Sequence, residues 1–301
     1  MPGLNPLDHP VALQHPLRLT PSAWAAHIPF GMFLVDIVRP GLLVELGTYS
    51  GVSFSAFCQA VKGLGLETRC HAVDTWKGDN HSGYYGEETL ADLKAHIETH
   101  YKGFAQLVES TFDQALDKFE DGTIDFLHID GYHAYESVKH DFESWLPKMS
   151  VRGVVILHDT NVREPGFGVW KLWEELKATY PHFELIHEHG LGVVATGDEM
   201  PHGLRLLTET SPEEAAIWRK FFHQLGQQLR VRLDKETEIY LLTAQLEAHA
   251  HQLQVVSHEL RNILNSRTWR SLSRYMWLKN FLLMSSTRLL QNFRRIRNDA
   301  Q

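Results

Sequence analysis

Two glycines stand four residues apart in the segment Glu45-Leu46-Gly47-Thr48-Tyr49-Ser50-Gly51-Val52-Ser53, which joins an apolar run to a helical pattern. Glycine lets the backbone turn sharply and approach a ligand closely. The free N–H groups at the start of the following helix can bind a carboxylate or a phosphate, and the Ser53 hydroxyl could hold a carboxylate. The spacing differs from the dinucleotide motif Gly-x-Gly-x-x-Gly. The segment therefore predicts a loop that binds an anionic ligand, the alternative being a tight turn without a ligand.

An acidic residue follows the next apolar run. Asp74 comes directly after residues 70–73 and 23 residues after Gly51. In a nucleotide-binding βαβ unit, a carboxylate at about this distance accepts hydrogen bonds from both ribose hydroxyls. An aspartate at this point can also cap a helix. Because the glycine loop lies upstream, we favour a nucleoside-binding role.

Two further aspartates follow apolar runs. Asp130 comes after Ile124–Ile129, and Asp159 comes soon after Val154–Leu157. The carboxyl ends of parallel strands meet at one edge of a sheet, so both carboxylates should face one crevice, where a pair of them can hold Mg²⁺. His133 lies near Asp130, and an ordinary histidine pKa of about 6.5 suits a general base. The alternatives are a helix cap for Asp159 and a loop-shaping role for His133.

Short apolar runs alternate with helical patterns through the middle of the chain. The expected strands are residues 42–44, 70–73, 105–108, 124–129 and 154–157, followed by a hairpin of 183–187 and 192–196. The expected helices are 23–38, 52–64, 87–101, 112–119, 135–146 and 169–180. This alternation is typical of parallel βαβ units buried on both faces. We predict an α/β, Rossmann-like, mostly parallel seven-stranded sheet with an antiparallel C-terminal hairpin.

Composition limits the possible classes of protein. The 301 residues carry a net charge of −8, which argues against a general nucleic-acid binder. Two cysteines are too few for a secreted disulfide scaffold. No signal-peptide pattern stands at the N-terminus, and no apolar run reaches the ~18 residues that cross a bilayer. These features predict a cytoplasmic protein.

The C-terminal third has a different period. Apolar side chains recur at alternating spacings of three and four residues, with His249 as the polar interruption, at Ile239, Leu242, Leu246, Leu253, Val256, Leu260 and Ile263. This heptad pattern predicts a coiled coil and a homo-oligomer. Residues 261–301 carry nine Lys/Arg and one acidic residue. A basic amphipathic helix of this kind can contact anionic lipid at the inner face of the membrane, the alternative being a helix that packs on its own dimer.

The expected domains follow from these patterns. They are an N-terminal arm and helix (1–40), a ligand-binding α/β domain (41–200), a linker (201–212), a coiled-coil helix (213–265) and a basic helical tail (266–301).

Together the motifs resemble those of class I S-adenosylmethionine-dependent methyltransferases. The stretch Glu45–Ser53 is similar to the loop of catechol O-methyltransferase-like enzymes. The signature Ile129-Asp130-Gly131-Tyr132-His133-x-Tyr135, with Asp141 and with Gly153 leading to His158-Asp159, resembles macrolide-sugar O-methyltransferases and cephalosporin hydroxylase-like proteins. Ala72–Asp79 and Ser266–Arg270 resemble segments of bacterial polysaccharide-assembly proteins.

The resemblance implies a role for each residue. S-adenosylmethionine would be bound by Glu45, Gly47, Tyr49, Gly51, Ser53, Asp74, Thr75, Thr111 and Asp130. Asp130 and His133 would be catalytic, with His133 taking the proton of the acceptor, and Asp130 and Asp159 would hold Mg²⁺. One departure is that His158 and Thr160 flank Asp159, where metal-dependent relatives carry an acid or Asn.

The implied activity is transfer of a methyl group to a hydroxyl of a sugar, in a bacterial polysaccharide or other glycoconjugate. Two alternatives stay open at this point. One is a non-catalytic scaffold in a glycan-assembly complex, and the other is a methyltransferase of a phenolic or macrolide natural product.

Overall fold

The structure is a computed structural model that describes residues 4–79 and 83–298. The chain divides into two compact units, residues 1–234 and 235–301. The long helix α8 (Pro212–Asn265) contributes residues to both units.

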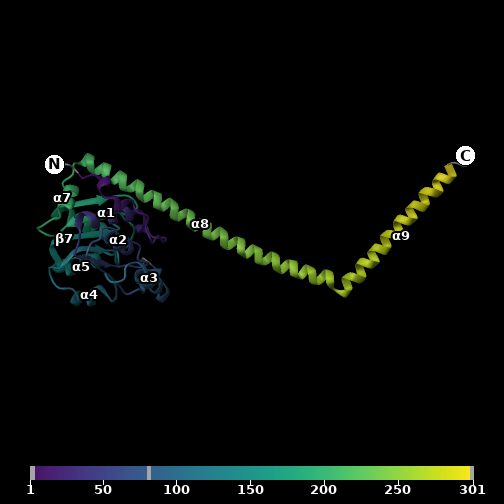
Figure 1. The fold of residues 1–301 in the computed structure, drawn as a ribbon, viewed down its shortest axis with the longest axis horizontal. Helices are drawn as coiled ribbons and strands as arrows, with labels where there is room; N and C mark the ends of the chain where they lie inside the picture. Colours follow the sequence, from purple (N-terminus) through teal and green to yellow (C-terminus); the bar gives the residue numbers. More distant parts are fainter. Residues whose placement is uncertain (1–3, 80–82, 299–301) are drawn as a thin grey trace. The chain divides into compact units, whose positions relative to one another are not determined.

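A seven-stranded sheet forms the centre of the first unit (Figure 1). Its strands are β1 (Leu42–Leu46), β2 (Arg69–Asp74), β5 (Ala105–Glu109), β6 (Ile124–Ile129), β7 (Met149–His158), β8 (His182–Leu185) and β9 (Leu191–Ala195). Their spatial order is β5-β2-β1-β6-β7-β9-β8; β9 runs antiparallel to both β7 and β8, and the other neighbouring pairs are parallel. The predicted Rossmann-like α/β fold with an antiparallel C-terminal hairpin is thus confirmed.

Helices cover both faces of the sheet. One face packs against α1 (Ile28–Val38), α2 (Val52–Gly63), α3 (Glu87–His100), α7 (His202–Thr208) and the start of α8. The other packs against α4 (Phe112–Ala115), α5 (Tyr135–Trp145) and α6 (Val169–Thr179). Side chains alternate along a strand, so Leu43 joins the first core and Val44 the second. This two-sided burial explains why the strands are continuous apolar runs.

Several elements differ from the sequence-based expectation. The first helix begins as a 3₁₀ turn, Ala23–His27, and becomes α1 at Ile28, because Pro29 suits only the first turn of an α-helix. Ser22 caps it as expected, accepting a hydrogen bond from the Trp24 amide at 3.1 Å. A small hairpin of β3 (Gly78–Asp79) and β4 (Gly83–Tyr84) was not predicted.

The largest difference concerns the end of the α/β unit. Residues 201–212, expected to be a linker, include α7, whose Leu204 and Leu207 are fully buried. The first turns of α8 also bury Trp218 and Phe222 in the same core as α1. The α/β unit therefore extends to about residue 234 rather than 200, because these apolar side chains complete one face of the sheet.

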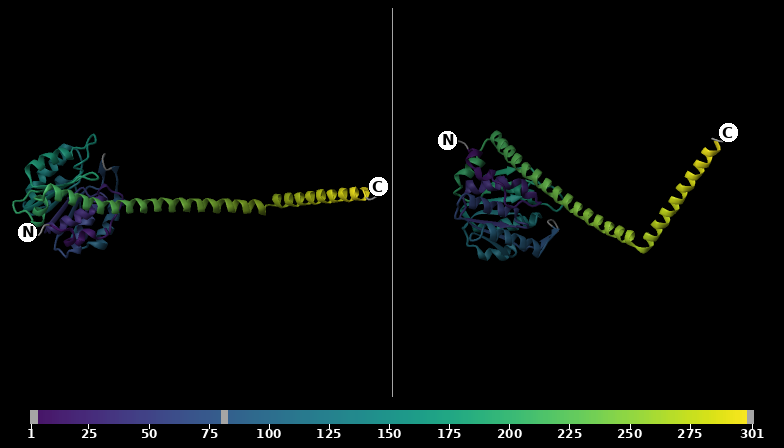
Figure 2. Two further views of the ribbon diagram at one scale, coloured as in Figure 1. Left: turned by 90° about the horizontal axis from the view of Figure 1, so that it is seen from above. Right: turned by 45° about the vertical axis from the view of Figure 1, so that its right-hand side comes forward.

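The second unit contains the remainder of α8 and α9 (Arg267–Asn298) (Figure 2). The heptad side chains lie exposed along α8; Leu246 and Leu253, for instance, are 69% and 68% exposed. No helix of the described residues is long and apolar enough to cross a membrane.

The exposed heptad side chains generate a test of the predicted homo-oligomer. Pairing of two or more copies would bury this stripe, because a and d side chains of a coiled coil pack between helices. We expect the full chain to sediment as a dimer or trimer and Leu253→Lys to sediment as a smaller species. Gln254→Lys, which adds the same charge one position outside the stripe, should leave the mass unchanged. A monomeric unmutated chain would contradict the prediction.

Candidate active site

The loop after β1 requires glycine at its turn. Gly47 has a φ of 84°, a left-handed conformation that favours glycine. A Cβ at this position would lie 2.1 Å from the backbone oxygen of Asp130, so no side chain fits there. The loop after β1 therefore lies directly against the end of β6.

Asp74 holds this loop in place. Its Oδ2 accepts hydrogen bonds from the amides of Thr48 and Tyr49, each at 2.8 Å, and its Oδ1 accepts one from the Trp76 amide at 2.8 Å. A carboxylate has about four acceptor positions, so most of them are used inside the protein. The ribose-binding role of Asp74 stays a prediction, to which the structure adds a role in shaping the loop.

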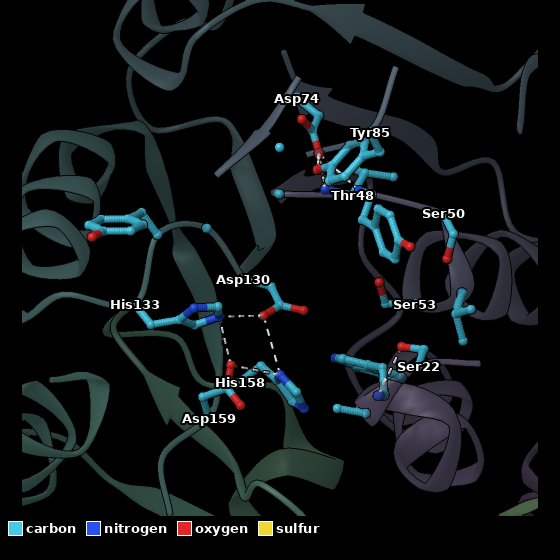
Figure 3. A pocket seen from close by; sticks show the side chains of 18 of the residues that line it. Ser22, Thr48, Ser50, Ser53, Asp74, Tyr85, Asp130, His133, His158 and Asp159 are labelled. Carbon is cyan, nitrogen blue, oxygen red and sulfur yellow. Dashed lines mark hydrogen bonds and ion pairs between the residues drawn. The ribbon is translucent and has the colours of Figure 1, made fainter. Parts of the chain in front are cut away.

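A cavity of about 470 Å³ opens at the carboxyl ends of β1, β2, β6 and β7 (Figure 3). Of the residues predicted from sequence, it is lined by Gly47, Tyr49, Ser53, Asp74, Thr75, Thr111, Asp130, His133 and Asp159. Figure 3 shows Asp74 at one end and Asp130, His133 and Asp159 at another, with Ser53 on the wall between. Lining residues that sequence reasoning missed include Ser22, Trp24, Tyr85, His158, Phe167 and His189.

Two predicted cofactor residues do not line the cavity. Gly51 begins α2 in the left-handed conformation, and a Cβ there would meet Leu93 at 2.4 Å, so this glycine allows α3 to pack closely. Glu45 is fully buried, and its Oε2 lies 2.9 Å from Nδ1 of His128.

Glu45 belongs to a buried network behind the cavity wall. The indole N–H of Trp24 can only donate, and it lies 3.1 Å from Nε2 of His128. Nε2 of His128 is therefore the acceptor, and its Nδ1 carries the hydrogen that Glu45 accepts. Because Trp24 lines the cavity, this network ties the N-terminal segment to β1 and β6. Nothing in the sequence around His128 indicated that it would join Trp24 and Glu45.

Asp130, His133, His158 and Asp159 form a compact cluster at the cavity floor (Figure 3). Nε2 of His133 lies 2.8 Å from Oδ2 of Asp159. Nδ1 of His158 lies 3.2 Å from Oδ1 of Asp130 and 3.3 Å from Oδ2 of Asp159. His189 adds a contact of 2.8 Å to the other oxygen of Asp159.

The cluster shifts the pKa values of its members. Burial alone would raise the pKa of Asp130 and Asp159, but the charge of His158 and hydrogen bonds from both histidines hold these pKa values well below their usual range. Burial alone would lower the pKa of His133, but the carboxylates of Asp130, 3.8 Å from its Nε2, and of Asp159, at 2.8 Å, raise it to about 9. At neutral pH, the His133 imidazole in this arrangement is therefore protonated on both ring nitrogens and positively charged, and it would have to lose one of these protons before acting as the predicted base.

The same side chains offer a donor set for a divalent cation. One atom each of Asp130, His133 and Asp159 lie within 4.8 Å of one another. The predicted metal residues Asp130 and Asp159 are thus adjacent, and His133 joins them. Carboxylate and imidazole groups are ordinary ligands of divalent ions, so the residues present fit a metal.

Comparison with known families identifies the central part of the chain. Residues 44–160 match the family described as "Methyltransferase domain". The match runs from β1 to the residues just after β7. The predicted site residues from Glu45 to Asp159 all belong to it, whereas the wall residues Ser22 and Trp24 and the loop residue Phe167 lie outside it.

Individual proteins are also similar. The uncharacterized protein y4gI of Sinorhizobium fredii is 47% identical over 224 residues, which cover 74% of this chain and 24% of that protein. The chain thus spans about a quarter of the length of this relative. The methyltransferase PaMTH1 of Podospora anserina is 14% identical, with 56% of this chain and 77% of that one covered and a TM-score of 0.44. The O-methyltransferase TomG of Streptomyces achromogenes is 13% identical, with 60% and 93% covered and a TM-score of 0.43.

The close approach at Gly47 can be tested by thermal or urea unfolding. Gly47→Ala should lower the free energy of unfolding by about 2 kcal/mol or more, because it adds a clash with Asp130 to the cost of a positive φ. Gly65 is the matched control, since its φ is 62° and nothing lies within 4 Å of a Cβ there. Gly65→Ala should cost only about 1 kcal/mol. Equal losses in the two variants would contradict the account of the loop.

The region that matches the family also contains a carboxyl with a raised pKa. Asp141 on α5 is 8% exposed, and burial, together with the charge of Asp113, raises its pKa to about 7 despite His140 nearby. In the unfolded chain Asp141 loses its proton near pH 4, whereas in the folded chain it keeps the proton up to about pH 7. The free energy of unfolding therefore falls as the pH rises from about 4 to 7. Asp141→Asn should therefore raise the free energy of unfolding by about 1 kcal/mol or more at pH 8 and change it little near pH 3. Asp117→Asn, the same change at an exposed aspartate, should alter the stability equally little at both pH values. A lower stability of Asp141→Asn at pH 8 would contradict the prediction.

Proposed function

We propose that this chain is an S-adenosylmethionine-dependent O-methyltransferase and that its acceptor is a sugar hydroxyl in a bacterial polysaccharide or glycoconjugate. The observation that carries the proposal is a single cavity in the region that matches the methyltransferase family. One end of it holds the glycine loop and Asp74, and the floor holds Asp130 with two histidines.

In the proposed complex the cofactor lies along the cavity with its methionine carboxylate at α2 and its adenine beyond Asp74. The methionine carboxylate would meet the N-terminus of α2 and the Ser53 hydroxyl, because free N–H groups and a hydroxyl bind an anion. A ribose hydroxyl would donate to Oδ1 of Asp74, which accepts a hydrogen bond from the Trp76 amide, because Oδ2 already accepts from the amides of Thr48 and Tyr49. The adenine would lie between Thr111 and the loop after β2, which leaves the sulfonium methyl facing Asp130.

The reaction is an in-line displacement. The acceptor oxygen forms a bond to the methyl carbon, the carbon–sulfur bond breaks with its electron pair going to sulfur, and the hydroxyl proton passes to the neutral form of the His133 imidazole. Alignment of oxygen, carbon and sulfur supplies much of the barrier reduction. Asp130 and Asp159 can accept a hydrogen bond from the acceptor hydroxyl and orient its lone pair. A divalent ion bound at the cluster would add polarisation of that hydroxyl.

The sugar acceptor rests on two supports. The segment from Ile129 to Tyr135 resembles macrolide-sugar O-methyltransferases. The cavity mouth also presents half-exposed aromatic rings, since Tyr49 is 42% and Tyr132 38% exposed, and such rings offer an apolar face beside a polar hydroxyl.

Binding of the cofactor is the first test. Isothermal titration of the full chain should detect S-adenosylmethionine, and Ser53→Ala should weaken it about tenfold, since a hydrogen bond to a charged group contributes about 1.5–3 kcal/mol. Ser55→Ala, two residues further along α2 and outside the cavity wall, should bind as the unmutated chain does. No binding at millimolar cofactor would refute the proposal.

Transfer is the second test. Labelled cofactor and a bacterial glycan extract should give labelled glycan, and Asp130→Asn should lower the rate of transfer at saturating cofactor by about 100-fold or more. Cofactor binding without transfer to any glycan would favour the scaffold alternative. Transfer to phenolic compounds alone would replace the sugar acceptor.

A further inference from the structure

The cluster at the cavity floor offers mixed donor atoms. Asp130 follows β6, His133 lies in the loop after it, and Asp159 follows β7. Their ligand atoms are two carboxylate oxygens and one imidazole nitrogen, all within 4.8 Å of one another. These side chains are largely withdrawn from solvent, with 14% of His133 and 5% of Asp159 exposed. A cation bound here would therefore meet at least one nitrogen donor.

A second imidazole faces the same oxygens. His158 is 4% exposed, and its Nδ1 lies within 3.3 Å of both Asp130 Oδ1 and Asp159 Oδ2. Two histidines thus converge on one carboxylate pair from opposite sides, as Figure 3 shows. The nitrogen content of the site is high for a centre built around two aspartates.

The hydroxyl of Thr160, the residue next to Asp159, is engaged elsewhere. Thr160 directly follows Asp159, but its hydroxyl donates to Glu184 at 3.0 Å. A Cβ at Gly190 would lie 2.5 Å from that hydroxyl oxygen, so the Thr160 hydroxyl points toward the β8–β9 turn. Within the described residues, the cluster therefore keeps its mixture of oxygen and nitrogen donors.

Donor type selects the ion. Mg²⁺ requires near-ideal octahedral geometry, is bound mainly through oxygen and gives up its water slowly. Imidazole suits first-row transition ions, whose affinity for mixed nitrogen and oxygen sites generally exceeds that of Mg²⁺. The Mg²⁺ expected from sequence rested on oxygen ligands, namely the two aspartates with nearby amide or hydroxyl oxygens, and not on an imidazole nitrogen.

We propose that Asp130, His133 and Asp159 bind a first-row divalent transition ion, such as Mn²⁺ or Fe²⁺, in preference to Mg²⁺, with His133 as a nitrogen ligand. In the ion-bound chain His133 is a ligand, and a group other than His133 then accepts the proton of the acceptor hydroxyl. This inference goes beyond the proposed methyl transfer and does not depend on it, because the ion can be titrated without cofactor or acceptor.

The first measurement compares two ions on the full chain. Isothermal titration should show Mn²⁺ binding at least about tenfold more tightly than Mg²⁺. Pulsed electron paramagnetic resonance of bound Mn²⁺ should show coupling to an imidazole nitrogen. Equal affinities for Mn²⁺ and Mg²⁺, or bound Mn²⁺ without nitrogen coupling, would overturn the proposal.

The second measurement changes the ligand. His133→Asp converts the donor set to oxygen, so the ratio of Mn²⁺ to Mg²⁺ affinity should fall several-fold and the nitrogen coupling should weaken or vanish. A fall in this ratio with Mg²⁺ still bound cannot arise from misfolding. His258→Asp, the same change on the exposed surface of α8, should leave the ratio unchanged. An unchanged ratio in His133→Asp would show that His133 is not a ligand.

The two proposals fail separately. Absence of ion binding in a chain that still binds S-adenosylmethionine would overturn the metal site and leave the proposed function standing. Ion binding with the predicted preference in a chain that does not bind S-adenosylmethionine would do the reverse.

Discussion

The contact between Gly47 and the backbone of Asp130 is the constraint on which the cavity depends. The Gly47 amide donates to Val73 O at 3.0 Å, and the Asp130 amide donates to Leu46 O at 2.8 Å, so the ends of β1, β2 and β6 are joined at this point. There is no room for a Cβ between the loop after β1 and the loop after β6. Because these loops touch, the glycine loop and the Asp130 cluster share one cavity.

Charge balance maintains the other half of the cavity. Two buried carboxylates would repel each other, but His133 and His158 each contact them and, when protonated, neutralise the pair. The carboxylate of Asp74 is stabilised differently, because uncharged backbone amides donate hydrogen bonds to it. The cavity therefore has one end set by peptide dipoles and a floor set by ionic contacts, and a cofactor and a cation are suited to different parts of it.

Sequence reasoning was most successful where periodicity and strand ends determine structure. The alternating apolar runs predicted the seven strands, and the residues after their carboxyl ends predicted nine of the cavity-lining residues, from Gly47 to Asp159. The position of Trp24 could not be predicted, because its role depends on a hydrogen bond to His128, more than a hundred residues away. Glu45 and Gly51 belong to the same sequence motif as the lining residues but do not line the cavity. Glu45 is buried against His128, and Gly51 is a glycine because α3 packs closely against it. The extension of the α/β unit through α7 and into α8 was missed because Leu204, Trp218 and Phe222 fill a face of the sheet that no local pattern reveals.

In the proposed function the glycine loop and the Asp130 cluster serve one reaction centre. A crystal structure of the full chain with S-adenosylhomocysteine would show whether they do. We expect the homocysteine carboxylate at Ser53, a ribose hydroxyl at Asp74 and the sulfur facing Asp130. A ligand bound with its adenine at the Asp130 cluster, or bound outside this cavity, would contradict this expectation.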